Sequence, residues 1–289
     1  MTDTVPTGPT GPTVTSYGAR LRALTQARGS LCVGIDPHPE LLAAWGLPDN
    51  AGGLERFALT CAEAFAGERA VIKPQSAFFE RHGSAGIAVL ERTLAAIRAG
   101  GALSLLDVKR GDIGSTMTAY AQAYVGPGSL LAADAVTVSP YLGYESLRPV
   151  IDLAKEHGRG VYVLTLTSNP EGGQVQHAVG SAGRSVAQEM ALGARADNAG
   201  EQSLGSVGLV VGATVGPAAA ELGLDLVAVN GPLLAPGFGA QGGTVADLRQ
   251  VFGAAIGNVL PASSREILAA GPDVGALRAA ARRTQDLLA

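Results

Sequence analysis

The stretch Leu103-Ser-Leu-Leu-Asp-Val-Lys-Arg-Gly-Asp-Ile113 begins as an apolar strand and ends in charged residues. Side chains alternate across a strand, so Asp107 and Lys109 are expected to point the same way. Asp112 follows three residues after Lys109. Charges crowded at the end of a buried strand are costly, because each must be desolvated and paired again. Proteins seldom keep such an arrangement for stability alone, so the stretch predicts a functional site.

Short apolar runs recur on both sides of this strand, with helical stretches between them. Runs that suit burial on both faces are typical of parallel strands. Eight such repeats, without a second zone of composition, favour one α/β domain folded as a closed (β/α)8 barrel over an open doubly wound sheet. The predicted strands are 31–35, 70–73, 103–109, 135–139, 160–167, 207–213, 232–236 and 256–262.

The seventh strand, the long connection after the fifth strand and the N-terminal residues are less regular than the rest of the pattern. For the seventh strand, 226–230 competes with the preferred 232–236. The segment 168–204 is longer than a usual strand-to-helix connection and contains one predicted helix, so we expect an elaborated loop over the site. The overlapping stretch 167–173 either lines the site or forms an ordinary turn. Residues 1–14 are rich in Thr, Gly and Pro and predict a disordered tail, which leaves 15–289 as the barrel domain.

Composition argues against several classes of protein. The 289 residues carry a net charge of −4 and contain no basic cluster, which argues against nucleic acid as the main partner. No apolar run reaches membrane-spanning length, and the N-terminus lacks a charged segment followed by an apolar one. We therefore expect a cytoplasmic protein with no membrane partner.

The cysteines and histidines do not predict a metal site. Cys32 and Cys61 form neither a disulfide framework nor a metal-binding spacing, so we expect small buried hydrophobic side chains in a reducing compartment. The histidines are scattered without the spacing of metal ligands. They are His38, His82, His157 and His177.

Polar residues stand where four consecutive predicted strands end. In a (β/α)8 barrel the active site lies at the carboxyl ends of the strands. Any one of these residues has an ordinary explanation, as a turn starter, a snorkelling lysine or a helix cap. As a set that continues one inward-facing row, they predict an active site. They are Asp36, Lys73, Asp107 with Lys109, and Ser139.

The run Pro236-Gly-Phe-Gly-Ala-Gln-Gly-Gly243 follows the seventh strand. Its glycines let backbone N–H groups approach an anion closely, and Gln241 can hydrogen-bond a phosphate oxygen or a base edge. Arg265, after the eighth strand, can make a charge-assisted contact. The loops after strands seven and eight often bind phosphate in such barrels. A glycine-rich loop alone is also compatible with an ordinary turn, but with Arg265 it predicts a phosphate site.

These residues resemble the orotidine 5′-phosphate decarboxylase family, in its longer bacterial subgroup (type 2). The similarity covers most of residues 16–288, although 224–232 departs from the family pattern. The Asp-x-Lys-x-x-Asp pattern is specific to the superfamily, and the ordered set of motifs is specific to the decarboxylase. The motifs are Val33-Gly-Ile-Asp-Pro37, Val71-Ile-Lys-Pro-Gln75, Asp107-Val-Lys-Arg-Gly-Asp-Ile-Gly-Ser-Thr116, Val138-Ser-Pro-Tyr141, Thr167-Ser-Asn-Pro170, Ala235-Pro-Gly-Phe-Gly-Ala-Gln-Gly-Gly243 and Pro261-Ala-Ser-Ser-Arg265.

The resemblance implies decarboxylation of orotidine 5′-monophosphate to UMP, the last step of pyrimidine synthesis, with neither cofactor nor metal. It implies that Lys109 donates a proton to carbon 6, and that the partner in solution is a second copy of the chain in a homodimer with shared active sites. The implied charge network around Lys109 is Lys73, Asp107 and Asp112. The implied substrate contacts are Asp36 and Thr116 at the ribose, Ser139 at the pyrimidine, and Gln241 with Arg265 at the phosphate; Asp112 and Thr116 would reach the partner's site.

The implied chemistry has a clear physical basis. Loss of carbon dioxide leaves a carbanion with no cofactor to absorb the electrons. A cation beside that carbon stabilises the developing charge and then donates the proton. Neighbouring acids favour the protonated lysine. They also repel the substrate carboxylate, by about 4 kcal/mol for like charges ~4 Å apart at an effective dielectric near 20.

Three other functions remain open from the sequence. A metal-dependent sugar-phosphate decarboxylase or aldolase of the same superfamily shares the Asp-x-Lys-x-x-Asp pattern. A non-catalytic barrel that binds nucleotide phosphates would need the glycine-rich loop and Arg265, but not the charged network. An enzyme that forms a Schiff base would need a lysine that loses its proton readily, whereas adjacent acids favour the charged form.

Overall fold

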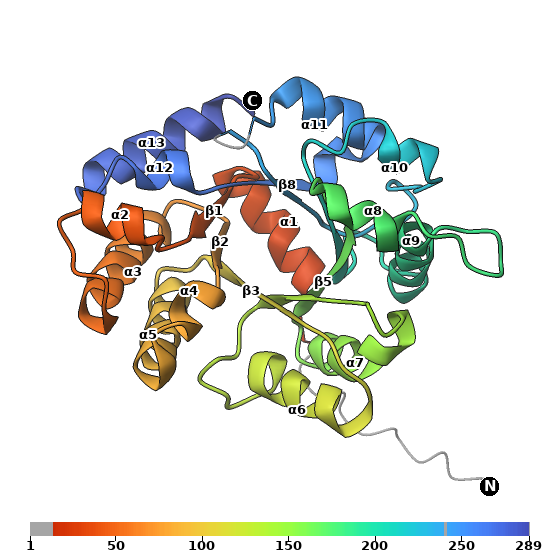
Figure 1. The fold of residues 1–289 in the computed structure, drawn as a ribbon, viewed down its shortest axis with the longest axis horizontal. Coiled ribbons are helices and arrows are strands. Elements are labelled where there is room, and N and C mark those ends of the chain that lie inside the picture. Colours follow the sequence, from red (N-terminus) through yellow and green to blue (C-terminus); the bar gives the residue numbers. More distant parts are fainter. Residues whose placement is uncertain (1–13, 240–241, 289) are drawn as a thin grey trace, which may run out of the picture.

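Eight parallel strands close into a barrel in chain order, with β1 paired to β8 (Figure 1). The computed structural model describes residues 14–239 and 242–288. The closed barrel confirms the predicted fold class. The strands are β1 (Cys32–Ile35), β2 (Val71–Pro74), β3 (Leu103–Arg110), β4 (Ala135–Val138), β5 (Gly160–Leu166), β6 (Val207–Val211), β7 (Leu233–Pro236) and β8 (Val259–Ser263).

Helices surround the barrel and bury their apolar faces against it, as α5 does with Val89, Leu90 and Leu94. Five helices begin at a Ser, Asn, Thr or Asp whose side chain accepts a backbone N–H, which satisfies a group that the first turn leaves unpaired. The helices are α1 (Tyr17–Arg28), α2 (Pro39–Ala44), α3 (Ala51–Phe65), α4 (Ala77–Glu80), α5 (Gly83–Ala99), α6 (Gly114–Val125), α7 (Arg148–Glu156), α8 (Gly173–Gln176), α9 (Val186–Asp197), α10 (Ala218–Glu221), α11 (Val245–Phe252), α12 (Arg265–Leu268) and α13 (Val274–Asp286), with 3-10 turns η1 (Tyr144–Leu147), η2 (Pro170–Gly172) and η3 (Gly253–Asn258).

Helix α1 closes the amino end of the barrel. Its arginines bind residues one or two positions before strands: Arg20 binds the Asp134 carboxylate and the Gly158 carbonyl, and Arg22 binds the Gly257 carbonyl. Inside the barrel, the hydroxyls of Tyr17 and Tyr162 lie 2.8 Å apart in a second hydrophobic core, separate from the one under the outer helices. With this end filled, the carboxyl ends of the strands are left to form the site.

The boundaries of the predicted strands were partly wrong. Strand β7 confirms the preferred position, and 226–230 forms a turn without strand pairing. The predicted start of the eighth strand at residue 256 is wrong, because Ile256 lies exposed in η3 and β8 begins at Val259. The segment 168–204 contains the expected helix, α9, and also η2 and α8.

The cysteines, the N-terminal residues and the absence of a membrane span were also predicted from the sequence. Cys32 and Cys61 are buried and unpaired, as predicted. The disordered tail predicted for residues 1–14 lies almost wholly outside the described residues, of which Val14 is the first. Within the part of the chain that the structure describes, no helix is long and apolar enough to cross a bilayer.

The closure by α1 can be tested at its buried tyrosine pair. Tyr162→Phe leaves the Tyr17 hydroxyl buried without a partner, so we expect the free energy of unfolding to fall by about 1–3 kcal/mol. Tyr17→Phe should have the same effect. The double variant should lose less than the sum, because no orphaned hydroxyl remains. Urea titrations of the four proteins measure this, and strictly additive losses would contradict the pairing.

Candidate active site

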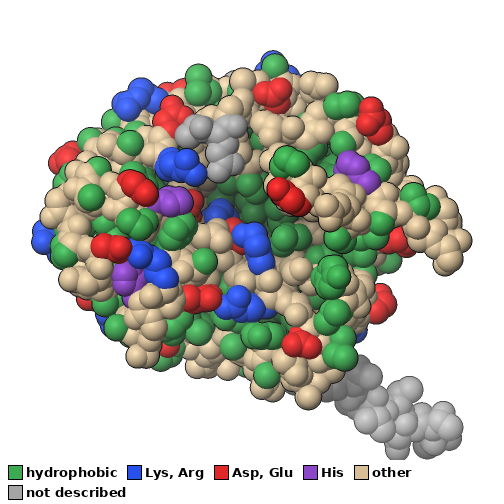
Figure 2. Space-filling view, viewed as in Figure 1, with side chains coloured by type: hydrophobic (Ala, Val, Ile, Leu, Met, Phe, Trp, Pro, Cys, Tyr) green, Lys and Arg blue, Asp and Glu red, His purple; other side chains and the backbone are tan. Residues whose placement is uncertain are grey.

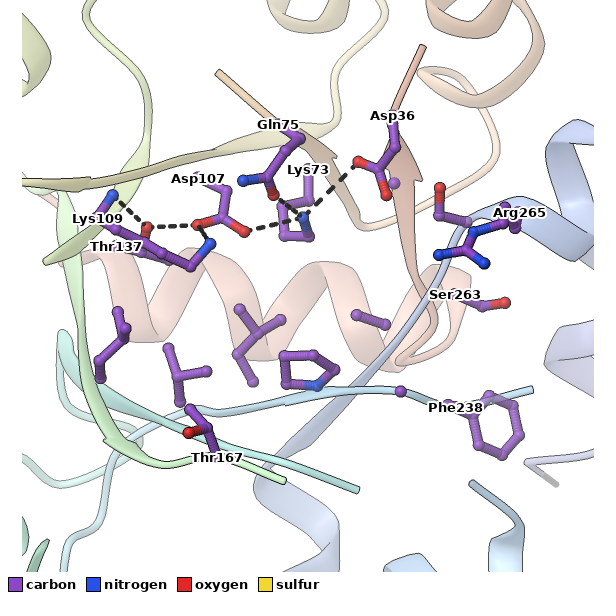
Figure 3. A pocket seen from close by; sticks show the side chains of 18 of the residues that line it. Asp36, Lys73, Gln75, Asp107, Lys109, Thr137, Thr167, Phe238, Ser263 and Arg265 are labelled. Carbon is purple, nitrogen blue, oxygen red and sulfur yellow. Dashed lines mark hydrogen bonds and ion pairs between the residues drawn. The ribbon is translucent and has the colours of Figure 1, made fainter. Parts of the chain in front are cut away.

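A pocket opens at the carboxyl ends of the strands and has two unlike walls (Figures 2 and 3). Strands β1 to β4 and the residues just after them supply the polar wall, whereas β5 to β8 supply an apolar wall. Residues after β7 and β8 line the remaining edge. The polar wall includes Asp36, His38, Lys73, Gln75, Asp107, Lys109 and Thr137, and the mainly apolar wall includes Leu164, Val210, Leu234, Pro236 and Ala262, with Thr167 and Ser263 as its polar members.

The Asp107 carboxylate is buried between two lysines (Figure 3). One of its oxygens, Oδ2, lies 3.1 Å from Lys73 Nζ, and the other, Oδ1, lies 2.6 Å from Lys109 Nζ. Burial alone would raise the pKa of this carboxyl. The two ammonium groups outweigh burial and hold its pKa well below the usual range. Asp107 is therefore ionised at neutral pH.

Lys73 is the buried cation of the site. Besides Asp107, its Nζ faces the Asp36 carboxylate at 3.9 Å and donates a hydrogen bond to Gln75 Oε1 at 3.1 Å. Burial alone would lower the pKa of Lys73, but Asp107 and then Asp36 more than compensate, so its pKa is raised. An amine held this firmly in its charged form is a poor nucleophile, which argues against a Schiff base at Lys73.

Lys109 reaches the pocket through an irregularity in β3, not through simple strand alternation. Leu106 pairs with Val136 and Arg110 with Val138, so β3 advances four residues where β4 advances two. Lys109 lies in this bulge with φ at +47°, a left-handed conformation that is uncommon for a residue with a side chain. The side chain is 44% exposed and bends back to Asp107.

Arg265 and the loop after β7 line the edge of the pocket. Gly237 and Gly239 have φ of +99° and +80°, which a glycine adopts without strain, and Gly237 with Phe238 lines the pocket. Arg265 is exposed and lines this edge, so its positive charge is available at the opening of the pocket. Gln241 lies outside the described residues.

Comparison with known proteins shows the family of this chain. Residues 29–280 match the model of the Orotidine 5'-phosphate decarboxylase / HUMPS family. The chain belongs to this family. A curated orotidine 5'-phosphate decarboxylase from Salinispora arenicola is 64% identical over 93% of this chain and 95% of its own length. One from Streptomyces coelicolor is 60% identical over 92% and 95%.

A solved structure has the same fold. The Streptomyces avermitilis protein, named as a candidate orotidine 5'-phosphate decarboxylase, has a TM-score of 0.92 and 57% identity, with 98% of each chain covered. The Leishmania donovani OMP decarboxylase is more distant, with a TM-score of 0.70 and 30% identity over 93% of this chain and 95% of that chain. The family fold is therefore present over nearly the whole chain.

Five of the nine residues predicted for this decarboxylase-family site meet in the one pocket. They are Asp36, Lys73, Asp107, Lys109 and Arg265. Ser139 lies in an adjoining groove, which shares Lys109, Leu164 and Thr167 with the pocket. Thr167 lines both the pocket and this groove, and Asn169, Glu171 and Gly172 line the groove alone.

Asp112 and Thr116 do not line the pocket of their own chain. Asp112 follows β3, and its Oδ1 accepts a hydrogen bond from the Ile113 N–H at 2.8 Å. Thr116 is exposed in the first turn of α6. Both residues stay predicted contacts with the partner's site.

Sequence reasoning missed Gln75 and Thr137, although both were within reach. Gln75 stands two residues after Lys73, and Thr137 two residues before Ser139, so each continues an inward-facing row that had already been identified. A simpler signal was also present. The chain contains only three lysines, at 73, 109 and 155, and two of them line one pocket.

The pairing of Asp107 predicts a pH-dependent loss of stability. Asp107→Asn leaves Lys73 buried without its main counter-charge, so we expect the free energy of unfolding at pH 7 to fall by about 3 kcal/mol. The folded pKa of Asp107 lies below the unfolded value of about 3.9, so the stabilisation is present above that value and is lost as the pH falls toward the folded pKa.

The free energies of unfolding of the wild type and of Asp107→Asn should therefore become more similar below about pH 4. Urea unfolding at pH 7 and at several values below pH 4 measures it. Asp152→Asn, at an exposed acid on α7, is the matched control. A difference that stays constant down to acid unfolding would contradict the charge pairing.

Proposed function

We propose that this chain decarboxylates orotidine 5′-monophosphate to UMP and carbon dioxide in pyrimidine synthesis, and that it does so in the cytoplasm. The observation that carries this proposal is the ionised Asp107 between two ammonium groups, in a pocket whose other wall is apolar. Relatives named as orotidine 5'-phosphate decarboxylases, at 60–64% identity over nearly the full length, support the same activity.

Lys109 is the proposed proton donor. The bond between carbon 6 of the pyrimidine and its carboxylate breaks, carbon dioxide leaves, and the electron pair stays on carbon 6. The Lys109 ammonium beside Asp107 stabilises that charge and transfers a proton to the carbon. Because the side chain is 44% exposed, Lys109 regains its proton from solvent.

Asp107 and the apolar wall act on the substrate before the bond breaks. An ionised carboxylate in the pocket repels the substrate carboxylate, and this repulsion is relieved when carbon dioxide leaves. The apolar wall formed by Leu164, Val210 and Leu234 removes water from the reacting carbon. Binding of the phosphate by Arg265 supplies the free energy that holds this arrangement together.

Further contacts with the substrate complete the proposal. Asp36 holds a ribose hydroxyl from the polar wall, and Ser139 contacts the pyrimidine from the groove that also contains Lys109. Gln241 remains a proposed phosphate ligand from the sequence alone. The proposed phosphate contacts, Gln241 and Arg265, follow β7 and β8, the usual position of a phosphate site in such barrels.

The arrangement of the lysines favours this reaction over a metal-dependent one. Lys73 Nζ lies between the Asp107 and Asp36 carboxylates, at 3.1 and 3.9 Å, and is a counter-charge to both. A divalent cation would seek these same oxygen ligands and would have to displace the ammonium group. In residues 14–239 and 242–288, no three His, Cys, Asp or Glu side chains are grouped to hold a metal ion.

We also propose that two chains form a homodimer and share their active sites. Asp112 and Thr116 lie away from their own pocket, and the adjacent Ile113 is 61% exposed. Tyr141 in the neighbouring groove is 78% exposed. Exposed apolar side chains beside an active-site face are typical of an interface between subunits. Asp112 and Thr116 would then enter the partner's pocket.

The decay of ultraviolet absorbance of orotidine 5′-monophosphate tests the reaction directly. We expect rapid loss that yields UMP and is unchanged by EDTA. Lys109→Ala should lower kcat by at least about 100-fold, because it removes the proton donor. Lys155→Ala, at a lysine on the outside of α7, should leave kcat unchanged.

Three results would overturn parts of this proposal. Activity that disappears with EDTA would favour the metal-dependent relatives. Binding of UMP without any turnover would favour a non-catalytic barrel. A folded Lys109→Ala variant with wild-type kcat would remove Lys109 from its assigned role.

Mixed dimers test the shared site. Lys109→Ala and Asp112→Ala chains should each be inactive alone. After unfolding and joint refolding, activity should return, because a heterodimer rebuilds one site from an intact Lys109 and the partner's intact Asp112. Absence of recovery, with heterodimers shown to be present, would contradict sharing.

A further inference from the structure

We propose that Thr137 is a positioning residue that fixes both the backbone and the side chain of Lys109 for proton transfer. Thr137 is the third residue of β4, is almost fully buried and lines the pocket beside Asp107 and Lys109. Its catalytic meaning rests on the proposed function, whereas its effect on the conformation of Lys109 does not.

The bulge in β3 places Thr137 opposite the catalytic lysine. Between the paired positions Leu106–Val136 and Arg110–Val138, three residues of β3 face only Thr137 of β4. In a regular ladder, backbone groups of the neighbouring strand would fix the strand here. In this bulge the Lys109 N–H donates instead to the Thr137 hydroxyl oxygen at 3.0 Å.

The direction of each hydrogen bond follows from the groups present. A backbone N–H can only donate, so Thr137 Oγ1 accepts from Lys109 and keeps its own proton for another partner. That partner is Asp107 Oδ1, at 2.7 Å. The same Oδ1 accepts from Lys109 Nζ at 2.6 Å.

A closed ring of interactions results (Figure 3). It runs from the Lys109 N–H through the Thr137 hydroxyl to the Asp107 carboxylate, and from there to the ammonium group of Lys109. The Thr137 hydroxyl thus contacts the backbone of Lys109 directly and its ammonium group through Asp107. Because Lys109 has a φ of +47°, which residues with a side chain seldom adopt, its conformation depends on such fixed partners.

Substitutions at Thr137 can separate the role of its hydroxyl from the role of its shape. Thr137→Val keeps the shape but removes the hydroxyl, whereas Thr137→Ser keeps the hydroxyl. Thr93→Val is the matched control, because Thr93 is equally buried and its hydroxyl donates to the Val89 carbonyl at 2.8 Å in α5, away from the pocket. Unfolding curves for all three separate stability from activity.

We expect Thr137→Val to lower kcat by about 10- to 100-fold, the effect of misplacing a reacting group by about 1 Å. KM should stay close to the wild-type value, because Arg265 is untouched. Thr137→Ser should retain most of the activity, and Thr93→Val should retain the wild-type kcat. Wild-type kcat in folded Thr137→Val would overturn the proposal. If the valine variant does not fold, Thr137→Ala makes the same comparison.

A crystal structure of Thr137→Val separates this proposal from the proposed function. We expect Lys109 to leave its left-handed conformation or its Nζ to move away from Asp107. If the wild type fails to decarboxylate orotidine 5′-monophosphate, the proposed function fails, and the position of Lys109 still tests Thr137. An unchanged Lys109 in the variant would overturn the positioning role.

Discussion

The buried Asp107 carboxylate is the constraint on which the rest of the site depends. An ionised acid at this depth requires compensating partners, and both of its oxygens receive them from Lys73, Lys109 and Thr137. Each partner is in turn fixed by a strand end or by the bulge in β3. The barrel makes this possible, because it brings β2, β3 and β4 side by side with their carboxyl ends on one face.

The amino end of the barrel supports the site by closing the interior beneath it. Helix α1 and the pair Tyr17–Tyr162 fill the amino end, so the interior below the charged residues is a packed core and not a channel. Gly160 takes part in this closure, since a Cβ there would lie 2.3 Å from Tyr17 Cδ1. A dry, packed floor keeps water from competing for the ion pairs above it, which strengthens the electrostatics that the proposed reaction needs.

Much of the fold and of the site followed from local patterns in the sequence. Inward-facing polar residues at strand ends identified Asp36 and Lys73, which belong to regular strands, and Asp107, which is the first residue of the bulge in β3. The same rule predicted Lys109, but its actual route into the pocket is a bulge that no periodicity reveals. The start of β8 was misplaced, because Ile256 has the hydrophobicity of a strand residue and lies exposed in a 3-10 turn.

The sequence pattern does not predict how separate loops, or two separate chains, lie relative to each other. Asp112 has the spacing of a residue beside Lys109, yet the direction of the chain after β3 takes it out of the pocket. The row that ends at Ser139 contains Thr137, but the contact of Thr137 with Lys109 depends on the irregular strand beside it, and β4 itself is regular.

The two walls of the pocket divide the work between the halves of the chain. The Asp and Lys side chains of the pocket come from β1 to β4, whereas β5 to β8 contribute the apolar surface and the edge around Arg265. The lysines and the proposed phosphate edge are therefore encoded in separate stretches of sequence. A designer could vary the second half to admit a different phosphate ester while leaving Lys73, Asp107 and Lys109 intact.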